Sequence, residues 1–321
     1  MKTSRLLILA MLLSLAALPA LAQVNDTYVI PVSANQAGAF GTHWLTRFSI
    51  FNPHLDYPLT VSISFLPTGG SVGTEELVEL PPNSLAYSDD LLGDLYDRTG
   101  SGALLVATFA EDNPTVADDV LSRSFLVTSD TYNNNPGGTY GQTIAGVWTG
   151  LLDYDYDGIS SVAHGIRNSG TFRTNIGAVN LGRCSVNVLV NVYDADGNTI
   201  LHQAPLTVPP LGHIQDRLPV AVERGSVEFF VSDPCSADDE KYAVVFPYTS
   251  TIDQHSGDPT YQQPALLASA GTLYGKKGQK IDPLALGKKI DSAYARNVRA
   301  GLERRGTARL TKTAEGWQIT K

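Results

Sequence analysis

Short stretches of alternating polar and apolar residues run along most of this chain, with turn-forming residues between them. Residues 60–65 (Thr-Val-Ser-Ile-Ser-Phe) alternate with a period of two, as a strand with one buried face does. Residues 67–70 (Pro-Thr-Gly-Gly) then break the pattern. Further strands are expected at 104–109, 120–128, 186–192, 227–231 and 242–248. Strands at this spacing predict an all-β fold of antiparallel β-sandwiches.

The order of these patterns is repeated within the chain. Four pairs of segments match in the same order: 46–52 with 174–180, 59–65 with 186–192, 80–82 with 208–210, and 139–142 with 260–263. The first and third pairs share one offset, 174 − 46 = 128 residues. Because the matching residues are strand and turn residues, the pattern predicts a duplicated domain whose shared positions encode a fold and not a reaction.

The N-terminus has the features of a cleaved secretory signal. Residues 1–5 are basic, residues 6–21 are apolar, and residues 20–22 (Ala-Leu-Ala) supply the small side chains that cleavage requires. After cleavage behind Ala22, no remaining apolar run is long enough to span a membrane. We therefore expect an exported protein, in the periplasm, at the cell surface or outside the cell, with no transmembrane segment once the signal is removed.

Length and repetition together divide the chain. About 300 residues remain after the signal, which suggests two domains on length alone. The predicted division is a signal peptide at 1–22, a first β-sandwich at 24–147, a joint at 148–160, a second β-sandwich at 161–268 and a basic extension at 269–321. Each copy is long enough to bury a core of its own.

Several motifs resemble a known family. In the second copy they lie at 172–180, 193–197 (Tyr-Asp-Ala-Asp-Gly) and 256–261 (Ser-Gly-Asp-Pro-Thr-Tyr), and in the first copy at 44–46 (Trp-Leu-Thr), 51–53 (Phe-Asn-Pro) and 80–82 (Leu-Pro-Pro). These motifs resemble a tandem, exported bacterial immunoglobulin-like β-sandwich repeat family over residues 28–265. The resemblance implies an immunoglobulin-like sandwich with a non-catalytic role at or outside the cell surface. It implies no catalytic residues.

Charge is unevenly divided between the body and the extension. Residues 271–321 hold 12 Lys and Arg against 4 Asp and Glu, a net charge of +8, so residues 1–270 carry −9 − 8 = −17. We expect the basic tail to attach the acidic body to an anionic partner or surface, or to the acidic body of a neighbouring molecule. The simpler alternative is that the tail folds back on the second copy. The residues expected to make this contact are Lys288, Lys289, Arg296, Arg299, Arg304 and Arg305.

The extension also has its own secondary-structure pattern. Apolar residues recur every four positions between residues 286 and 298, which predicts a helix that begins near Pro283. Residues 308–311 and 317–320 flank a short turn and predict a small hairpin.

Only two cysteines are present, Cys184 and Cys235, and both lie in the second copy. In an oxidising compartment an isolated pair usually forms a disulfide, which is the prediction here; two buried free thiols are the alternative. A bridge would close a loop of about 50 residues and would stabilise the fold by a few kcal/mol through chain entropy.

Alternating carboxylates mark the joint between the copies. Asp153, Asp155 and Asp157 precede Gly158, a spacing with which calcium loops arrange oxygen ligands. The twelfth position of such a loop is His164 here, where an EF-hand has a bidentate glutamate, so an EF-hand is not expected. A looser Ca²⁺ site between the copies is one interpretation, and a polar, turn-rich joint is the other.

Aromatic residues of the same joint are the candidate ligand-binding residues. Trp148, Tyr154 and Tyr156 lie close together in the sequence, and an exposed cluster of rings would suit a ligand or a partner. Packing in the core or between the domains is the alternative. Trp44 has a counterpart at Phe172 and is therefore expected in the core.

Enzyme motifs are not evident in the sequence. The six histidines lack the spacing of zinc ligands in hydrolases, and there is neither a G-x-S-x-G elbow nor a phosphate-binding glycine loop. Acidic pairs such as Glu75–Glu76 are expected at the surface, because any acidic protein offers them. No cofactor is expected apart from the Ca²⁺ interpretation.

These observations favour a non-enzymatic binding or structural protein that serves in adhesion, in envelope or matrix association, or as a scaffold. A carbohydrate-binding protein and an enzyme of unrecognised type are the alternatives. The expected partner is a protein or polysaccharide of the envelope or matrix, and not a specific nucleic acid. The pattern leaves the oligomeric state open.

Overall fold

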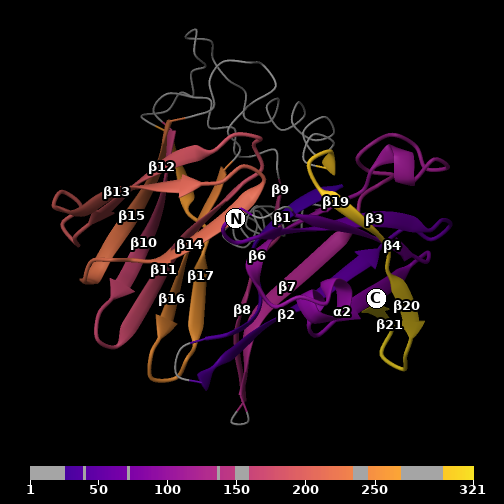
Figure 1. Cartoon of the computed structure of the whole chain (residues 1–321), viewed down its shortest axis with the longest axis horizontal. Helices are drawn as coiled ribbons and strands as arrows, with labels where there is room; N and C mark the ends of the chain where they lie inside the picture. Colours follow the sequence, from indigo (N-terminus) through magenta and orange to yellow (C-terminus); the bar gives the residue numbers. More distant parts are fainter. Residues whose placement is uncertain are drawn as a thin grey trace, which may run out of the picture.

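The protein belongs to the all-β class, as the alternating pattern predicts. A computed structural model describes residues 26–38, 41–70, 73–135, 138–148, 159–233, 245–268 and 299–321. In these ranges the chain forms several sheets, and helical structure is limited to α2 (Leu91–Tyr96), η2 (Ala110–Asp112) and single helical residues at Gly41 and Arg299 (Figure 1). No described helix has the length and apolar character needed to cross a membrane.

The first part of the chain, residues 26–148, forms most of one large sheet. Its strands are β1 (Thr27–Ala37), β2 (His43–Asn52), β3 (Leu59–Pro67), β4 (Thr74–Leu80), β5 (Ser84–Ser88), β6 (Gly100–Ala107), β7 (Leu126–Asn135), β8 (Gly138–Thr143) and β9 (Val147–Trp148). On one side the order is β4-β3-β6-β1, with β9 also on β1, and on the other β5-β2-β7-β8. The two sides meet where β1 pairs with β2, at Gln36 opposite Trp44.

The second part, residues 159–268, has the same succession of strand neighbours in two separate sheets. Its strands are β10 (Ile159–Asn168), β11 (Phe172–Asn180), β12 (Val186–Tyr193), β13 (Ile200–Val208), β14 (Gly212–Arg217), β15 (Val222–Asp233), β16 (Val245–Asp253), β17 (Pro259–Gln262) and β18 (Ala265–Ala268). One sheet runs β13-β12-β15-β10-β18 and the other β14-β11-β16-β17. Apart from the β1–β2 pairing and the tail strands added to β4 and β5, the neighbours of these strands are those of their counterparts in the first part.

A buried asparagine at the end of β2 fastens the following loop to the next hairpin. The Asn52 Nδ2 atom lies 3.1 Å from the carbonyl oxygen of Tyr57, 3.3 Å from that of Leu80 and 3.1 Å from that of Pro81, and donates to all three. Its Oδ1 accepts the His54 N–H at 3.0 Å. These bonds satisfy backbone groups that the strand ladders leave without partners.

The same arrangement recurs 128 residues later, at the end of β11. There the Asn180 Nδ2 atom donates to the carbonyl oxygens of Cys184, Val208 and Pro209, at 2.7, 3.4 and 3.1 Å. The Oδ1 atom accepts the Gly182 N–H at 2.7 Å. Four hydrogen bonds of one asparagine are thus reproduced by the other.

The turn after each double proline is repeated as well. Asn83 and Leu211 both have φ near 45°, in the left-handed region. Their N–H groups donate to the carbonyl oxygens of His54 and Gly182 at 2.8 and 2.9 Å. Asparagine tolerates this conformation, whereas leucine rarely adopts it, so the backbone geometry at this turn is retained even with a less suitable residue.

Not every predicted match has the predicted register. Residues 139–142 and 260–263 do lie on counterpart strands, β8 and β17. The ladders, however, place Gln142 opposite Thr131 and Thr260 opposite Thr251, so Gln142 corresponds to Thr260 and not to Gln263. The predicted strand at 120–128 is shorter than expected, because residues 120–123 form a turn and β7 begins at Leu126.

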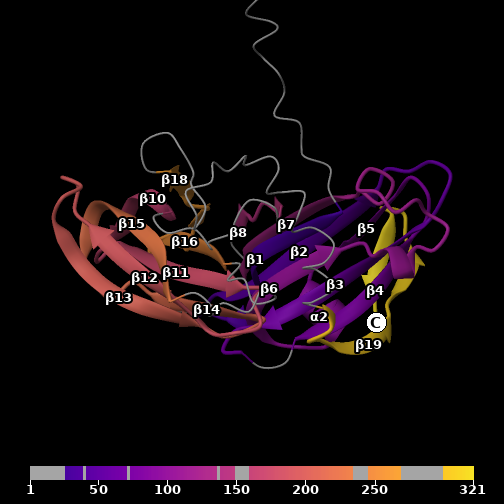
Figure 2. The ribbon, with the colours of Figure 1, turned by 90° about the horizontal axis from the view of Figure 1, so that it is seen from above.

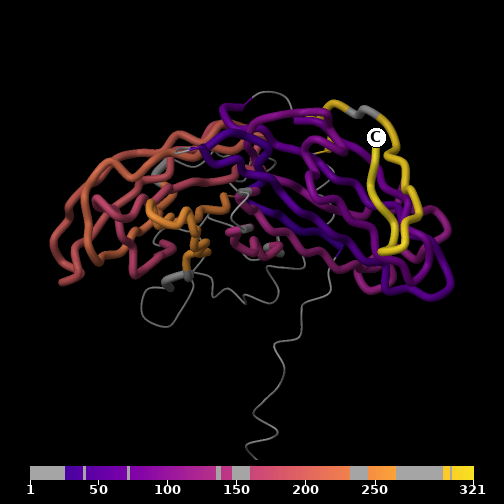
Figure 3. The backbone as a smooth tube through the Cα atoms, turned by 90° about the horizontal axis from the view of Figure 1, so that it is seen from below, coloured from indigo at the N-terminus to yellow at the C-terminus, as the bar shows by residue number. Residues whose placement is uncertain are grey.

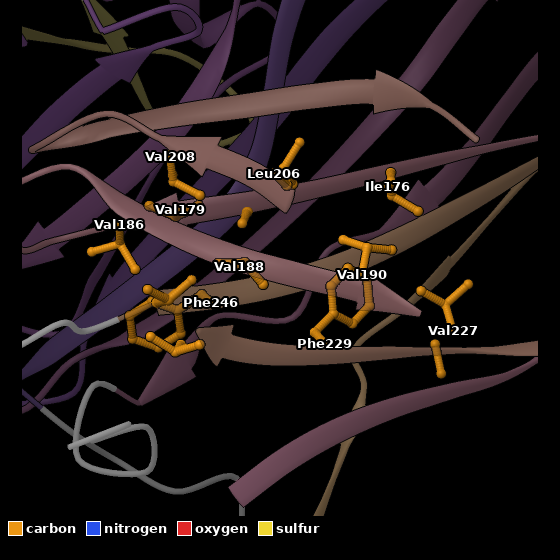
Figure 4. Packing of buried hydrophobic residues seen from close by; sticks show 14 of the residues in the cluster. Ile176, Val179, Val186, Val188, Val190, Leu206, Val208, Val227, Phe229 and Phe246 are labelled. Carbon is orange, nitrogen blue, oxygen red and sulfur yellow. The ribbon is translucent and has the colours of Figure 1, made fainter. Parts of the chain in front are cut away.

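The core of the second part lies between its two sheets. Val188 and Val190 of β12 and Phe229 of β15 face Phe246 of β16, and all four side chains are almost fully buried (Figure 4). Alternate residues of each strand point the same way, so the apolar positions of the sequence pattern collect on the inner faces.

β3 departs from the half-buried strand that its alternation predicts. Its polar residues Ser62 and Ser64 are both 2% exposed, because other parts of the chain cover the face that the pattern assigns to solvent. The Ser62 hydroxyl donates to the Glu75 carboxylate at 2.6 Å. Glu75 and Glu76 are themselves buried, so the expected surface position of this acidic pair is wrong.

The described part of the C-terminal extension lies on the first part of the chain. β19 (Glu303–Thr307) adds to the edge of β4 in parallel, and β20 (Arg309–Lys312) pairs with β21 (Trp317–Thr320), which continues onto β5. The yellow strands of Figure 3 lie at the end of the molecule away from the second part. The predicted hairpin is confirmed. Residues 299–321 lie on the first part, so the alternative in which the tail folds back on the second copy does not hold for them. The predicted helix lies outside the described residues.

Candidate functional site

A groove at the junction of the first and second parts is the best-formed candidate site. It consists of two hollows of about 230 and 120 Å³ that share Trp44, Arg173 and Ile252. We call these two hollows together the junction groove. Strands β14 and β16 of the second part lie beside β6 and β1 of the first part, respectively (Figure 2). The lining combines polar and apolar side chains, which sets the groove apart from an ordinary packing defect in a hydrophobic core.

One wall of the junction groove is the outer face of the sheet β14-β11-β16-β17. Arg173 and Asn175 of β11 face the same way because they are two residues apart, and the ladder places Asn175 opposite Ser250 of β16. Gln215 of β14 is opposite Gly177, two residues further along β11, and also lines the groove. Polar outward residues are typical of any sheet surface, so the alternation of polar and apolar residues does not indicate that this face meets another part of the chain.

The opposite wall comes from β1, β2 and β8 of the first part. Trp44 is 9% exposed and lines both hollows. A Cβ atom on Gly38 would lie 2.5 Å from the Trp44 Nε1 atom, so the indole ring occupies space that a larger residue would take. Gln142 of β8 joins the two walls, since its Oε1 atom accepts the Ser250 hydroxyl at 3.2 Å.

A buried histidine fixes the floor of the groove and ties the two parts together. The His213 Nδ1 atom lies 2.7 Å from the Thr68 hydroxyl of the first part, and Nε2 lies 2.7 Å from the Tyr248 hydroxyl of the second. The backbone joins them too, as the Gly69 N–H donates to the His213 carbonyl at 3.0 Å. A neutral imidazole offers one donor and one acceptor, which satisfies both hydroxyl partners.

The position of Tyr248 depends on a glycine in the neighbouring strand. A Cβ atom on Gly177 would lie 2.3 Å from the Tyr248 ring, so no side chain fits there. The ring therefore crosses β11, and its hydroxyl reaches both His213 and the Gln215 Oε1 atom, which it meets at 2.9 Å. The counterpart of Gly177 in the first part is Ser49, whose face is exposed. This Ser-to-Gly difference was the available sequence signal for the junction.

The stability of the junction is expected to fall in acid. Burial lowers the pKa of His213 to about 3, whereas an unfolded histidine titrates near 6.5. The unfolded chain therefore binds a proton below about pH 6.5 that the folded protein refuses. The stabilisation is complete above that pH and is lost progressively as the pH falls toward 3, by about 1.4 kcal/mol per pH unit at most. Urea titrations at pH 7, 5.5 and 4.5 measure this slope.

Two variants isolate the contribution of this histidine. His213→Gln, which cannot take up the proton, is expected to be less stable at pH 7 but to lose less stability on acidification. His255→Gln, at an exposed histidine, should keep the wild-type slope. If His213→Gln and the wild type lose stability in parallel between pH 7 and 4.5, the histidine is not the cause.

Of the described residues that line the larger hollow, Arg173 is the one with a full charge. Its Nε atom is buried and has no hydrogen-bond partner in the described structure. Burial lowers the pKa of Arg173, and the neighbouring Arg217 guanidinium lowers it further. Both causes disfavour the cation, which nonetheless stays protonated because the normal pKa of arginine is so high. The groove thus holds an uncompensated positive charge.

A cluster of ion pairs around Arg299 holds the tail against the first part. The Arg299 Nε atom lies 2.8 Å from a Glu75 oxygen, and Nη1 lies 2.6 Å from Asp112 and 3.3 Å from Glu111. The guanidinium also stacks on Phe109, 4.4 Å from the ring centre. The tail was predicted to attach the protein to another molecule or surface, whereas the acidic partners of Arg299 in the described structure belong to the first part of the same chain.

The other predicted site residues are not brought together by the described structure. Cys235, Asp153, Asp155, Asp157, Tyr154, Tyr156, Lys288, Lys289 and Arg296 lie outside the described residues. Trp148 is in β9 opposite Tyr28, and Arg304 and Arg305 are in β19, with only their backbones described. Cys184 packs against the core of the second part. Within the described ranges, no three His, Cys, Asp or Glu side chains come together as a metal site.

Comparison with known proteins adds little to this geometry. No family model matches the chain, and no curated protein matches it significantly. Among solved structures, one from Parabacteroides distasonis ATCC 8503, of a protein presumed to be secreted, is 11% identical; the match covers 76% of this chain and 89% of the other, with a TM-score of 0.19. A TM-score this low supports no conclusion about fold or function.

Proposed function

We propose that this chain is an exported, non-enzymatic binding protein built from two copies of an immunoglobulin-like β-sandwich, and that the junction groove binds a carbohydrate. The repeated strand order and the two matching asparagines, Asn52 and Asn180, support the duplication. Export rests on the signal-like N-terminus, and it underlies the disulfide predicted between Cys184 and Cys235. Both remain predictions.

The composition of the junction groove carries the carbohydrate proposal. Sugars are bound in proteins by an aromatic ring beneath the apolar face of the pyranose and by planar polar groups around its hydroxyls. Trp44 provides the ring, and Asn175, Gln142 and Gln215 provide amides within the same hollow. The larger hollow, at about 230 Å³, is below the usual size of a drug-like site and suits one or two sugar rings.

A scaffold without a ligand is the second candidate, and one observation favours it. Direct contacts join the first part to the tail and to the second part, as expected of a scaffold. A scaffold, however, does not require a polar groove with a tryptophan and an unpaired arginine at its junction. The groove therefore favours the carbohydrate proposal.

Glycan-array binding of the mature protein tests the proposed function. The wild type is expected to retain a restricted set of glycans. Trp44→Ala and Asn175→Ala are each expected to weaken that binding at least about tenfold, the loss that follows from removing a stacking surface or a hydrogen bond in a desolvated site. Isothermal titration calorimetry with the best glycan gives the affinities.

Tyr140→Ala is the matched control, because this exposed tyrosine of β8 does not line the groove. It should bind as the wild type does. Thermal unfolding of each variant shows whether Trp44→Ala still folds, and Asn175→Ala, at a half-buried residue, tests the groove with little risk to the core. Retention of no glycan by the wild type would refute the carbohydrate proposal and leave the scaffold.

A further inference from the structure

Arg173 places a cation in the junction groove without a counter-charge. It lines both hollows, and no described carboxylate pairs with it. Its Nε atom is enclosed and has no hydrogen-bond partner. Buried or half-buried arginines are normally paired, because the desolvated guanidinium loses its water without gaining an acceptor. The Arg173 guanidinium therefore has a hydrogen-bond donor that no described acceptor satisfies.

The charged neighbours of Arg173 strengthen this imbalance. Arg217 of β14 lies diagonally across the ladder, since Asn175 is opposite Arg217 and Arg173 is two residues from Asn175. Among the described residues, Asp253 is the one carboxylate at the groove. It lies in the smaller hollow, and its Oδ1 atom already accepts the backbone N–H groups of His255 and Ser256 at 2.8 and 3.4 Å. No carboxylate of the described chain lines the larger hollow.

We propose that the junction groove is specific for acidic glycans, in which the carboxylate of a uronic acid pairs with Arg173 while the sugar ring lies against Trp44. This inference rests on the proposed carbohydrate function and names the class of sugar. The planar guanidinium matches a carboxylate with two parallel N–H···O bonds, and such charge-assisted bonds are stronger than those to a neutral hydroxyl.

The rest of the protein makes such a site selective. Residues 1–270 carry a net charge of −17, so the body repels anions in general. An acidic glycan would therefore gain little from non-specific attraction and would depend on the local cation. Because the pair would form in a partly enclosed groove, salt would screen it less than it screens a surface pair.

Calorimetry with matched trisaccharides tests the inference on the full-length mature protein. The probes are a galacturonic acid trisaccharide, the galactose trisaccharide in which each carboxylate is replaced by a hydroxymethyl group, and a 6-sulfated galactose trisaccharide. The wild type is expected to bind the galacturonate at least about tenfold more tightly than the neutral sugar. Arg173→Gln should lower the galacturonate affinity by about tenfold to a hundredfold and leave the neutral sugar within about twofold.

Arg167→Gln is the control, because this exposed arginine stacks on Phe172 outside the groove and should leave all three affinities unchanged. Equal binding of the acidic and neutral sugars by the wild type would overturn the inference while leaving the proposed function intact. Tighter binding of the sulfated sugar would overturn the assignment of a carboxylate. If neither the acidic nor the neutral sugar binds, the inference falls together with the proposed function.

Discussion

Replacing Arg299 with alanine is expected to lower the free energy of unfolding by about 3–5 kcal/mol, the usual effect of removing one member of a buried ion pair. The Arg299 side chain is 12% exposed and that of Glu75 is 2% exposed. Without the guanidinium, the buried Glu75 carboxylate loses this ion pair, and the stacking on Phe109 is lost as well. At roughly 2–4 °C per kcal/mol for a protein of this size, the melting temperature should fall by about 10 °C. Calorimetry and urea titration measure both quantities.

Arg309→Ala is the control for this prediction, because Arg309 is exposed on the tail hairpin and should change stability by less than about 0.5 kcal/mol. A truncated chain that ends before residue 299 should reproduce the Arg299→Ala effect or exceed it, since β19 and β21 also pair with the edges of β4 and β5. If Arg299→Ala melts as Arg309→Ala does, the cluster contributes nothing and the tail is held by its strands alone.

Removing either repeated asparagine is expected to destabilise the fold by about 2–4 kcal/mol. In Asn180→Ala, the carbonyls of Val208 and Pro209 and the Gly182 N–H lose their partner while buried or half-buried. Each buried polar group left without a partner lowers the stability by about 1–3 kcal/mol, and hydrogen bonds to local water offset part of this loss. Asn52→Ala should have an effect of the same size, because its bonds are the same. Urea unfolding of both variants tests the equivalence.

Asn198→Ala is the comparison for both, since Asn198 lies in an exposed turn and bonds only locally to Asp196. It should fall within about 0.5 kcal/mol of the wild type. If one variant loses more than twice the stability that the other loses, the two asparagines do not contribute equally to the fold. A loss at neither would show that water replaces the side-chain bonds.

The local pattern of this chain was sufficient to locate many of its strands. Alternation at 59–65 and 186–192 located β3 and β12, and the ladders pair Leu59 with Leu80 and Val186 with Val208, as the matched segments require. Register further along was harder to predict. The match of 139–142 with 260–263 was based on similar residue types. The register in which β8 and β17 pair with their neighbouring strands is set by turn length, which residue similarity does not indicate.

Candidate sites were predicted less well, because each depends on residues far apart in the sequence. Trp44 was assigned to the core from its match with Phe172; it is indeed 9% exposed, yet it also lines the junction groove. Arg173 had no signal of its own, as an arginine on an outward strand position is ordinary. The aromatic and acidic residues of the joint attracted attention through their spacing, but they lie outside the described residues and stay predictions.

The sequence by itself determined the all-β class, most of the strand positions and the tail hairpin, because side-chain alternation and turn residues act over a few neighbouring positions. Only the tertiary structure decided which outward faces became interfaces. It placed Gly177 beneath Tyr248, brought His213 to Thr68, and set Arg299 against Glu75 on the first part and not the second. Polar residues on a strand look alike whether water or another sheet covers them, so contacts between distant segments leave no mark in the local pattern.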